Sequence, residues 1–136
     1  MSAPGRLGHA PGLAEFDGMM RAAFARLPDS FRDLAADVVL RVEDFPPDDV
    51  LASLSIDSEF DLLGLYQGVS LDKKSVLDPG ADGPDFVFLY RRPILHYWSE
   101  GGESLEDIVV HVLVHEIGHH FGLSDDDMER IEADAV

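Results

Sequence analysis

The chain has 136 residues, a formal net charge of −17 at neutral pH and no cysteine. This length and a 46% hydrophobic composition predict one compact domain with a substantial core. The acidic excess argues against nucleic-acid and anionic-membrane partners. Without cysteine, disulfides and thiolate metal sites are excluded, so a bound metal must be held by nitrogen and oxygen atoms. No segment reaches the ~20 apolar residues that span a bilayer, and a cytoplasmic location is expected.

Residues 1–12 contain proline, glycine and a single arginine, which predicts a flexible tail before a single domain at 13–136. Apolar residues recur with a helical period from Leu13 to Leu27, and Pro28 ends this helix, which we expect to cover a sheet. The elements predicted next, in chain order, are a strand at 37–42, a short helix at 47–54, a strand at 62–67, a loop at 78–84, and strands at 85–91 and 93–98.

A long apolar segment follows these strands. Ser104 is a good N-cap residue, and Asp107 three positions later favours the start of a helix there. From Leu105 the sequence is apolar around most of the helix circumference, which predicts a buried helix, and Gly122 is the expected left-handed residue after its end. The order of elements predicts an α+β fold, in which a small mixed sheet packs against this buried helix. Segment 93–98 would offer an edge to which an extended peptide could add.

The buried helix carries the sequence His115-Glu116-Ile117-Gly118-His119. Two residues four apart in a helix lie roughly 40° apart around the axis and about 6 Å along it, so His115 and His119 can bind one metal ion. Glu116 is then placed to act as the general base toward a metal-bound water. The other interpretation is that the histidines are hydrogen-bonded core residues and Glu116 a surface carboxylate. Burying these two histidines and Glu116 without partners would cost on the order of several kcal/mol, which favours the metal site.

A third ligand is needed, and Asp125 lies six positions after His119, beyond Gly122. The resulting pattern, H-E-x-x-H-x-x-G-x-x-D, places a carboxylate where longer zinc motifs have their last ligand. Asp125 also suits the first turn of a short C-terminal helix capped by Ser124, with Asp127 as its capping-box partner, and the two roles are compatible. The rivals for the ligand role are Asp126, Glu129 and Glu132.

Other polar residues near the motif are expected to support the site. His111 lies one turn before His115 and is expected to line the site rather than to act as a fourth ligand. His120 points away from the motif and is expected to be structural. The candidates for an oxyanion-stabilising donor are Tyr90, His96, Tyr97 and His111.

The segment from His115 to Asp125 resembles the small bacterial zincin-like metallopeptidase family. Segments 42–46, 63–68 and 88–94 resemble other blocks of that family, so the resemblance covers about residues 13–134. It implies a minimal zincin fold and a zinc peptidase in which His115, His119 and Asp125 bind Zn²⁺ and Glu116 is catalytic.

Only 17 residues follow His119, which predicts a shallow, open cleft. The expected substrate is therefore an unstructured peptide or unfolded protein, or else a protein partner completes the cleft. The alternative function is a catalytically weak or inactive module that binds metal or another protein.

Overall fold

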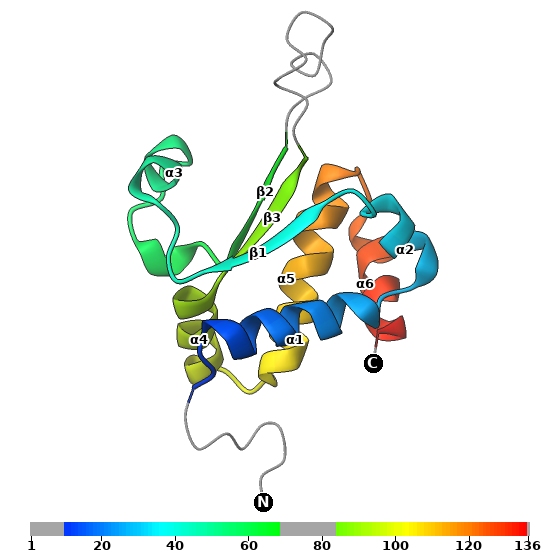
Figure 1. Ribbon diagram of the computed structural model, residues 1–136, viewed down its shortest axis with the longest axis horizontal. Helices are drawn as coiled ribbons and strands as arrows, with labels where there is room; N and C mark the ends of the chain where they lie inside the picture. The colour runs from blue at the N-terminus through cyan, green and yellow to red at the C-terminus, as the bar shows by residue number, and fades with distance from the viewer. Residues whose placement is uncertain (1–9, 69–83, 136) are drawn as a thin grey trace, which may run out of the picture.

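The computed structural model describes residues 10–68 and 84–135, and in them helices pack against a small sheet (Figure 1). The elements, in chain order, are α1 (Leu13–Ala25), α2 (Asp29–Leu34), β1 (Val39–Glu43), α3 (Asp48–Ser53), the 3₁₀ helix η2 (Glu59–Asp61), β2 (Gly64–Gln67), β3 (Phe86–Tyr90), α4 (Arg91–Glu100), α5 (Leu105–His120) and α6 (Asp125–Asp134). The strands form one three-stranded mixed sheet. The predicted α+β class is confirmed.

Strand β3 lies between the other two strands. Strand β1 runs parallel to it, whereas β2 runs antiparallel and forms an edge of the sheet. The Tyr90 N–H donates to the Leu63 carbonyl at 3.0 Å, and antiparallel partners alternate between bonded and non-bonded pairs. Gly64 and Tyr66 therefore turn their backbone groups away from β3, toward the open edge.

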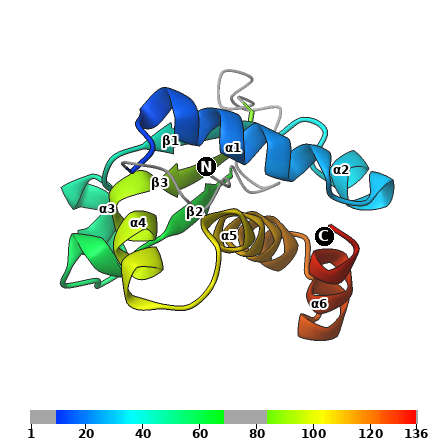
Figure 2. The same cartoon turned by 90° about the horizontal axis from the view of Figure 1, so that it is seen from below.

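Helices α1 and α5 pack beside each other on one face of the sheet, as Figures 1 and 2 show. Helix α1 contacts β1, and α5 contacts β2 and β3. Apolar side chains from these elements form one buried cluster, which includes Phe16, Met20, Val87, Leu89, Val109 and Leu113. The helical period read from 13 to 27 therefore identified the buried face of α1.

Helix α5 has the ends that the sequence predicts. The Asp107 N–H donates to the Ser104 side-chain oxygen at 3.1 Å, and Gly122 adopts a left-handed φ of +75° after the last turn. Its 16 residues include nine that are buried, so the expected burial is confirmed. Among residues 10–68 and 84–135, no helix has both the length and the apolar character needed to cross a membrane.

The segment at 93–98 is part of helix α4, so the strand predicted there is wrong. Tyr90 ends β3 and is at once the N-cap of α4. Pro93 is the third residue of this helix, where the missing N–H has no intrahelical partner to lose. Ile94 is buried and Trp98, four residues later, packs against the core, which is a helical spacing. The open strand edge beside α5 is therefore that of β2.

The remaining predicted elements agree with the structure within a few residues. The helix at 13–27 and the strand at 37–42 correspond to α1 and β1; the later segments at 47–54, 62–67 and 85–91 correspond to α3, β2 and β3. Helices α2 and η2 were not predicted. Pro28 was interpreted as a stop, yet it is also the N-cap of α2, whose Phe31 is buried. The loop predicted at 78–84 lies outside the described residues except for Pro84, as do residues 1–9 of the predicted tail.

Helix α6 begins with the predicted capping box. The Asp127 N–H donates to the Ser124 side-chain oxygen at 3.1 Å, and the Ser124 N–H donates to the Asp127 carboxylate at 3.4 Å. This fixes Asp125 as the first residue of the helix.

Gly118 allows α6 to pack directly against α5. A Cβ atom at this position would lie 2.5 Å from the sulfur of Met128 and 2.9 Å from its Cγ atom. Met128 is fully buried, so its side chain has no open space into which it could move. The glycine inside the histidine motif thus reflects a close helix contact.

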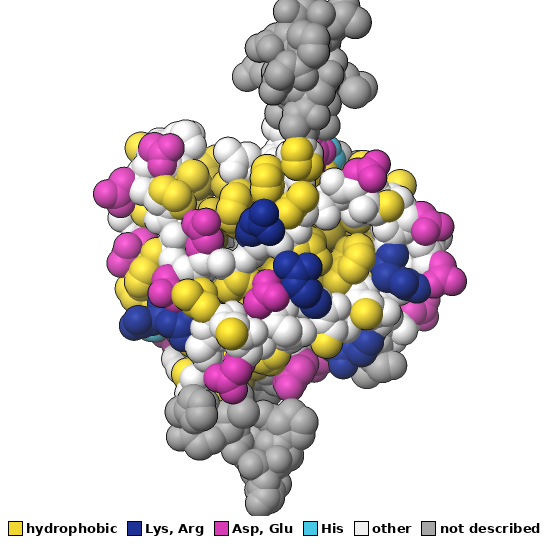
Figure 3. Space-filling model, in the orientation of Figure 1, with side chains coloured by type: hydrophobic (Ala, Val, Ile, Leu, Met, Phe, Trp, Pro, Cys, Tyr) yellow, Lys and Arg dark blue, Asp and Glu magenta, His cyan; other side chains and the backbone are white. Residues whose placement is uncertain are grey.

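The face drawn in Figure 3 shows how charge is distributed over the molecule. Apolar and basic side chains occupy its centre, and acidic side chains lie mostly toward its margin. Arg41 lies over the ring of Phe86, with its guanidinium carbon 5.7 Å from the ring centroid. On this face the negative charge is spread out rather than gathered at one point.

Replacing Gly118 with alanine should lower the free energy of unfolding by about 1–2 kcal/mol, because the overpacking at Met128 exceeds the helix-propensity gain. Urea denaturation followed by circular dichroism would measure this change.

Gly18 provides the matched control, because it lies in the middle of α1 and a Cβ there would have no neighbour within 4 Å in the described part of the chain. Alanine at Gly18 should raise the free energy of unfolding by about 0.5–1 kcal/mol. Equal effects of the two substitutions would contradict the close contact between α5 and α6.

Candidate metal centre

Two neighbouring stripes of α5 carry its polar side chains. His111, His115 and His119 are spaced four residues apart and share one stripe. Glu116 and His120 share the next stripe, which runs beside β2. The helix thus presents imidazoles on one side and a carboxylate next to the sheet edge on the other.

Glu132 of α6 brings the first two histidines together. Its carboxylate oxygens lie 2.8 Å from His111 Nδ1 and 3.1 Å from His115 Nε2. The rings of His111 and His115 are themselves 4.0 Å apart between centroids. One potential ligand atom from each of these three residues lies within 4.8 Å of the others, so the group could hold a metal ion.

The donor set of this cluster fits zinc. Zinc binds imidazole nitrogen at about 2.0–2.1 Å and carboxylate oxygen at about 2.0–2.2 Å, so two donors of a tetrahedral ion lie roughly 3.3 Å apart. The separation of 3.1 Å between His115 Nε2 and the Glu132 oxygen is close to that value. Two nitrogens and one oxygen also leave a fourth position for a water or substrate.

Two residues of the predicted ligand set lie outside this cluster. His119 is exposed, and its ring meets that of His115 edge to face, with 5.5 Å between centroids. Asp125 is exposed at the start of α6. Neither belongs to the group of converging ligand atoms found among the described residues. That His119 and Asp125 bind a metal together with His115 stays a prediction from the motif.

Glu132 was one of the alternatives to Asp125 as the third metal ligand predicted from the sequence. A stronger signal was present, because Glu132 follows Met128 by four residues and therefore shares its helix face. Met128 is the buried residue by which α6 packs on α5, so Glu132 points toward the same helix one turn later. His111 was expected to line the site through hydrogen bonding, and it bonds to Glu132 while also joining the cluster.

Glu116 lies against the open edge of the sheet. Its Oε1 atom accepts a hydrogen bond of 3.2 Å from the Tyr66 N–H of β2, one of the backbone groups turned away from β3. Burial raises the pKa of Glu116, whereas the bond from Tyr66 and the nearby His119 lower it, and the net direction is upward. The predicted base is thus partly desolvated and fixed beside both the histidines and the strand.

Tyr66 is anchored by its own side chain, and sequence reasoning missed this. Its hydroxyl donates to Asp85 at 2.7 Å, and its ring stacks on His120 with 3.8 Å between centroids. Burial and the bond to Asp85 raise the pKa of Tyr66, so the hydroxyl keeps its proton. His120 is therefore structural, as expected, and ties the end of α5 to β2.

The predicted oxyanion donors lie in different places. Tyr90 is almost fully buried, and burial raises its pKa to about 12. His96 faces Glu100 at 3.6 Å and packs against Phe60. Tyr97 is 46% exposed and, with His111, lines a cavity at the N-terminal end of α5. No oxyanion donor is assigned from these positions.

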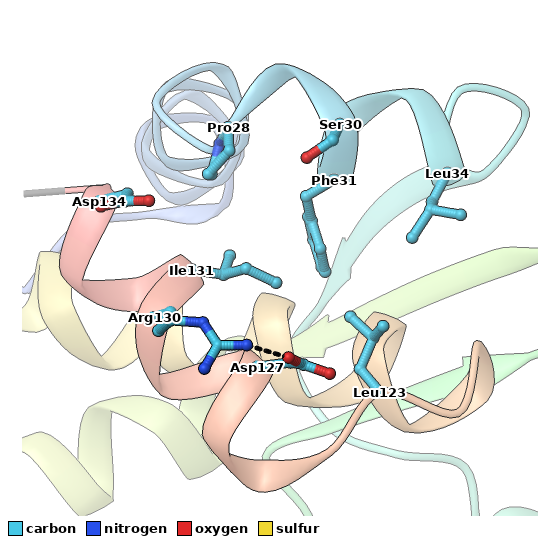
Figure 4. Close-up of a pocket in the computed structure, with 9 residues that line it drawn as sticks. All are labelled: Pro28, Ser30, Phe31, Leu34, Leu123, Asp127, Arg130, Ile131 and Asp134. Atoms are coloured by element: carbon cyan, nitrogen blue, oxygen red, sulfur yellow. Dashed lines mark hydrogen bonds and ion pairs between the residues drawn. The ribbon is translucent and has the colours of Figure 1, made fainter.

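A cavity of about 490 Å³ lies between α2 and α6. Figure 4 shows Phe31 and Leu34 from α2 opposite Ile131 from α6, with Arg130 paired to Asp127 at the side. Its lining includes no histidine and none of the predicted site residues. The cavity is therefore separate from the histidine stripe of α5.

In metal-free protein, Glu116→Gln should raise the free energy of unfolding at pH 7. The folded state binds the Glu116 proton more tightly than the unfolded chain, so ionisation opposes folding as the pH rises above the ordinary value of 4.5. Urea titrations in chelator from pH 4 upward should show the advantage of the variant growing with pH above 4.5 and levelling off once Glu116 is ionised in the folded state.

The exposed Glu129 of α6 gives the control, because Glu129→Gln removes the same charge without relieving burial. A pH-dependent gain of equal size at Glu129 would assign the effect to net charge instead.

A family model described as zincin-like metallopeptidase matches residues 35–135. The search of curated proteins finds no match. The matched range includes the sheet, the histidine helix and the helix that carries Glu132. Because the match extends over most of the chain, this protein belongs to the zincin-like metallopeptidase family.

Proposed function

We propose that this protein is a zinc-dependent peptidase in which Glu116 is the general base. The observation that carries the proposal is the position of Glu116, which bonds to the open edge of β2 and follows His115 directly on α5. A base is useful only within reach of both the attacking water and the substrate. This carboxylate lies between the histidine stripe and the strand where a peptide could bind.

Three side chains are arranged to hold the ion. His115 is common to the motif and to the converging cluster, and His111 and Glu132 complete the cluster. When bound, zinc would supply Lewis acidity and lower the pKa of a coordinated water. We propose Glu132 as the carboxylate ligand in place of Asp125, since it already lies 3.1 Å from His115 Nε2.

The substrate is proposed to be an extended peptide that lies along β2. At this edge Gly64 is buried and the Tyr66 N–H is bonded to Glu116, so the outward Tyr66 carbonyl is the group that can bond a further strand by a main-chain hydrogen bond. A peptide bound there passes next to the Glu116 carboxylate. An unstructured segment can adopt this extended form, whereas a folded protein surface cannot do so without local unfolding.

The proton chemistry follows from the surroundings of Glu116. In its ionised form the carboxylate accepts a proton from the attacking water, and it then returns the proton to the leaving amine. The burial that raises its pKa makes the carboxylate a stronger base, so it accepts this proton more readily than a fully solvated glutamate would. The Tyr66 N–H keeps the carboxylate oriented meanwhile.

A second candidate function is a non-catalytic metal-binding or protein-interaction module. The feature in its favour is that Glu132 already satisfies His111 and His115 by hydrogen bonds, which ties α6 to α5. In that case the cluster would serve stability alone, and Glu116 would have no chemical task.

Cleavage of an unstructured peptide library separates the two candidates. Glu116→Gln should retain zinc and lower kcat/KM by at least about 100-fold, because it removes the base but keeps the amide oxygen that Tyr66 can bond. His115→Ala should lose both zinc and activity. Equal cleavage by wild type and Glu116→Gln, or none by zinc-loaded wild type, would contradict the peptidase proposal.

The carboxylate ligand is tested by zinc affinity measured in competition with a chromophoric chelator. Glu132→Gln should weaken zinc binding by roughly 10–100-fold or more, and Asp125→Asn should change it only a few-fold. Asp125 is a suitable comparison because it lies on the same helix and carries the same charge. The reverse order of effects would assign the ligand role to Asp125, as the motif predicts.

A further inference from the structure

A cavity of about 210 Å³ adjoins the metal cluster at the N-terminal end of α5. Its walls come from the start of β2, from α4, and from α5 together with the turn before it. The lining residues are Leu63, Tyr97, Glu103, Ile108, His111 and Val112. We propose that this cavity is a specificity pocket that receives one leucine-sized apolar side chain of the bound peptide. The proposal rests on the peptidase function proposed above.

The pocket lies in line with the general base. Ile108, Val112 and Glu116 are spaced four residues apart and share one stripe of α5. Val112 is therefore about 6 Å along the helix axis from Glu116. An extended peptide advances roughly 3.3 Å per residue, so a side chain one or two positions from the cleaved bond reaches the pocket.

The pocket also adjoins the proposed path of the peptide. Leu63 immediately precedes Gly64, the first residue of β2. A Cβ atom on Gly64 would lie 2.6 Å from Val112, so the strand and the pocket floor are in direct contact. On the side of the pocket opposite Leu63, His111 belongs both to the pocket and to the metal cluster. A peptide on β2 thus passes the pocket and the metal cluster together.

The character of the lining favours an apolar occupant. Leu63, Ile108 and Val112 provide aliphatic surface, and Tyr97 adds an aromatic ring. Glu103 is the acidic member, and it is exposed to solvent, where its attraction for a lysine or arginine is screened. The gain from removing an apolar side chain from water exceeds that of such a surface ion pair. Leucine is therefore expected to be preferred over lysine as well as over alanine.

The test uses a set of unstructured peptides that differ at one position, with alanine, leucine, tryptophan or lysine there. Cleavage is measured with zinc-loaded wild type, and binding is measured by fluorescence anisotropy with zinc-loaded Glu116→Gln. Leucine should be favoured over alanine by about tenfold or more in both measurements. A flat preference, or a preference for lysine, would overturn the proposal.

Tyr97→Ala and Leu34→Ala form the matched pair of variants. Tyr97 and Leu34 are 46% and 45% exposed, so neither change is expected to unfold the protein. Widening the pocket with Tyr97→Ala should shift the preference from leucine toward tryptophan by about tenfold. Leu34 lines the separate cavity of Figure 4, and its replacement should leave the preference unchanged.

An unchanged preference in Tyr97→Ala, or an equal shift in Leu34→Ala, would overturn the pocket assignment. Binding that favours leucine without any cleavage would support the pocket and contradict the peptidase function. Cleavage that depends on Glu116 but shows no preference at any position would support the peptidase function and contradict the pocket.

Discussion

Two close contacts of glycine hold α5 against its neighbours, and the geometry of the site depends on them. A Cβ on Gly118 would meet Met128 of α6 at 2.5 Å, and a Cβ on Gly64 would meet Val112 at 2.6 Å. The first contact brings α6 near enough for Glu132 to reach the histidines. The second brings the edge of β2 near enough for its backbone to reach Glu116. Packing on both sides of one helix thus sets the positions of the ligands and of the base.

The polar groups of α5 are stabilised from these two sides in different ways. On the α6 side, Glu132 bonds to His111 and His115, so these imidazoles are oriented by a carboxylate. On the β2 side, the Tyr66 N–H orients Glu116, and Tyr66 is itself held by Asp85 and His120. The helix can carry the half-buried His115 and Glu116 because each has a hydrogen-bond partner. The same partners bring the ligand atoms and the base close together.

The sequence was sufficient to predict α5, its caps, the motif and most strands, because helical periodicity and capping are local properties. It failed at 93–98, where Pro93 was interpreted as the break or edge between two strands, although Pro93 lies in the first turn of α4. It also could not show that Glu132 meets His115 or that Tyr66 meets Glu116. These contacts join residues 17 and 50 positions apart, and their formation depends on tertiary packing. Tyr66 and Asp85 carry no motif that would have indicated their role.

We propose that the histidine stripe of α5 binds zinc between α6 and the edge of β2, within reach of Glu116. The most direct test is a crystal structure of zinc-soaked protein with data collected at the zinc absorption edge. We expect one strong anomalous peak at about 2.0–2.1 Å from the Nε2 atom of His115, with only nitrogen and oxygen ligands. A peak confined to surface carboxylates, or its absence from this stripe, would contradict zinc binding by these histidines.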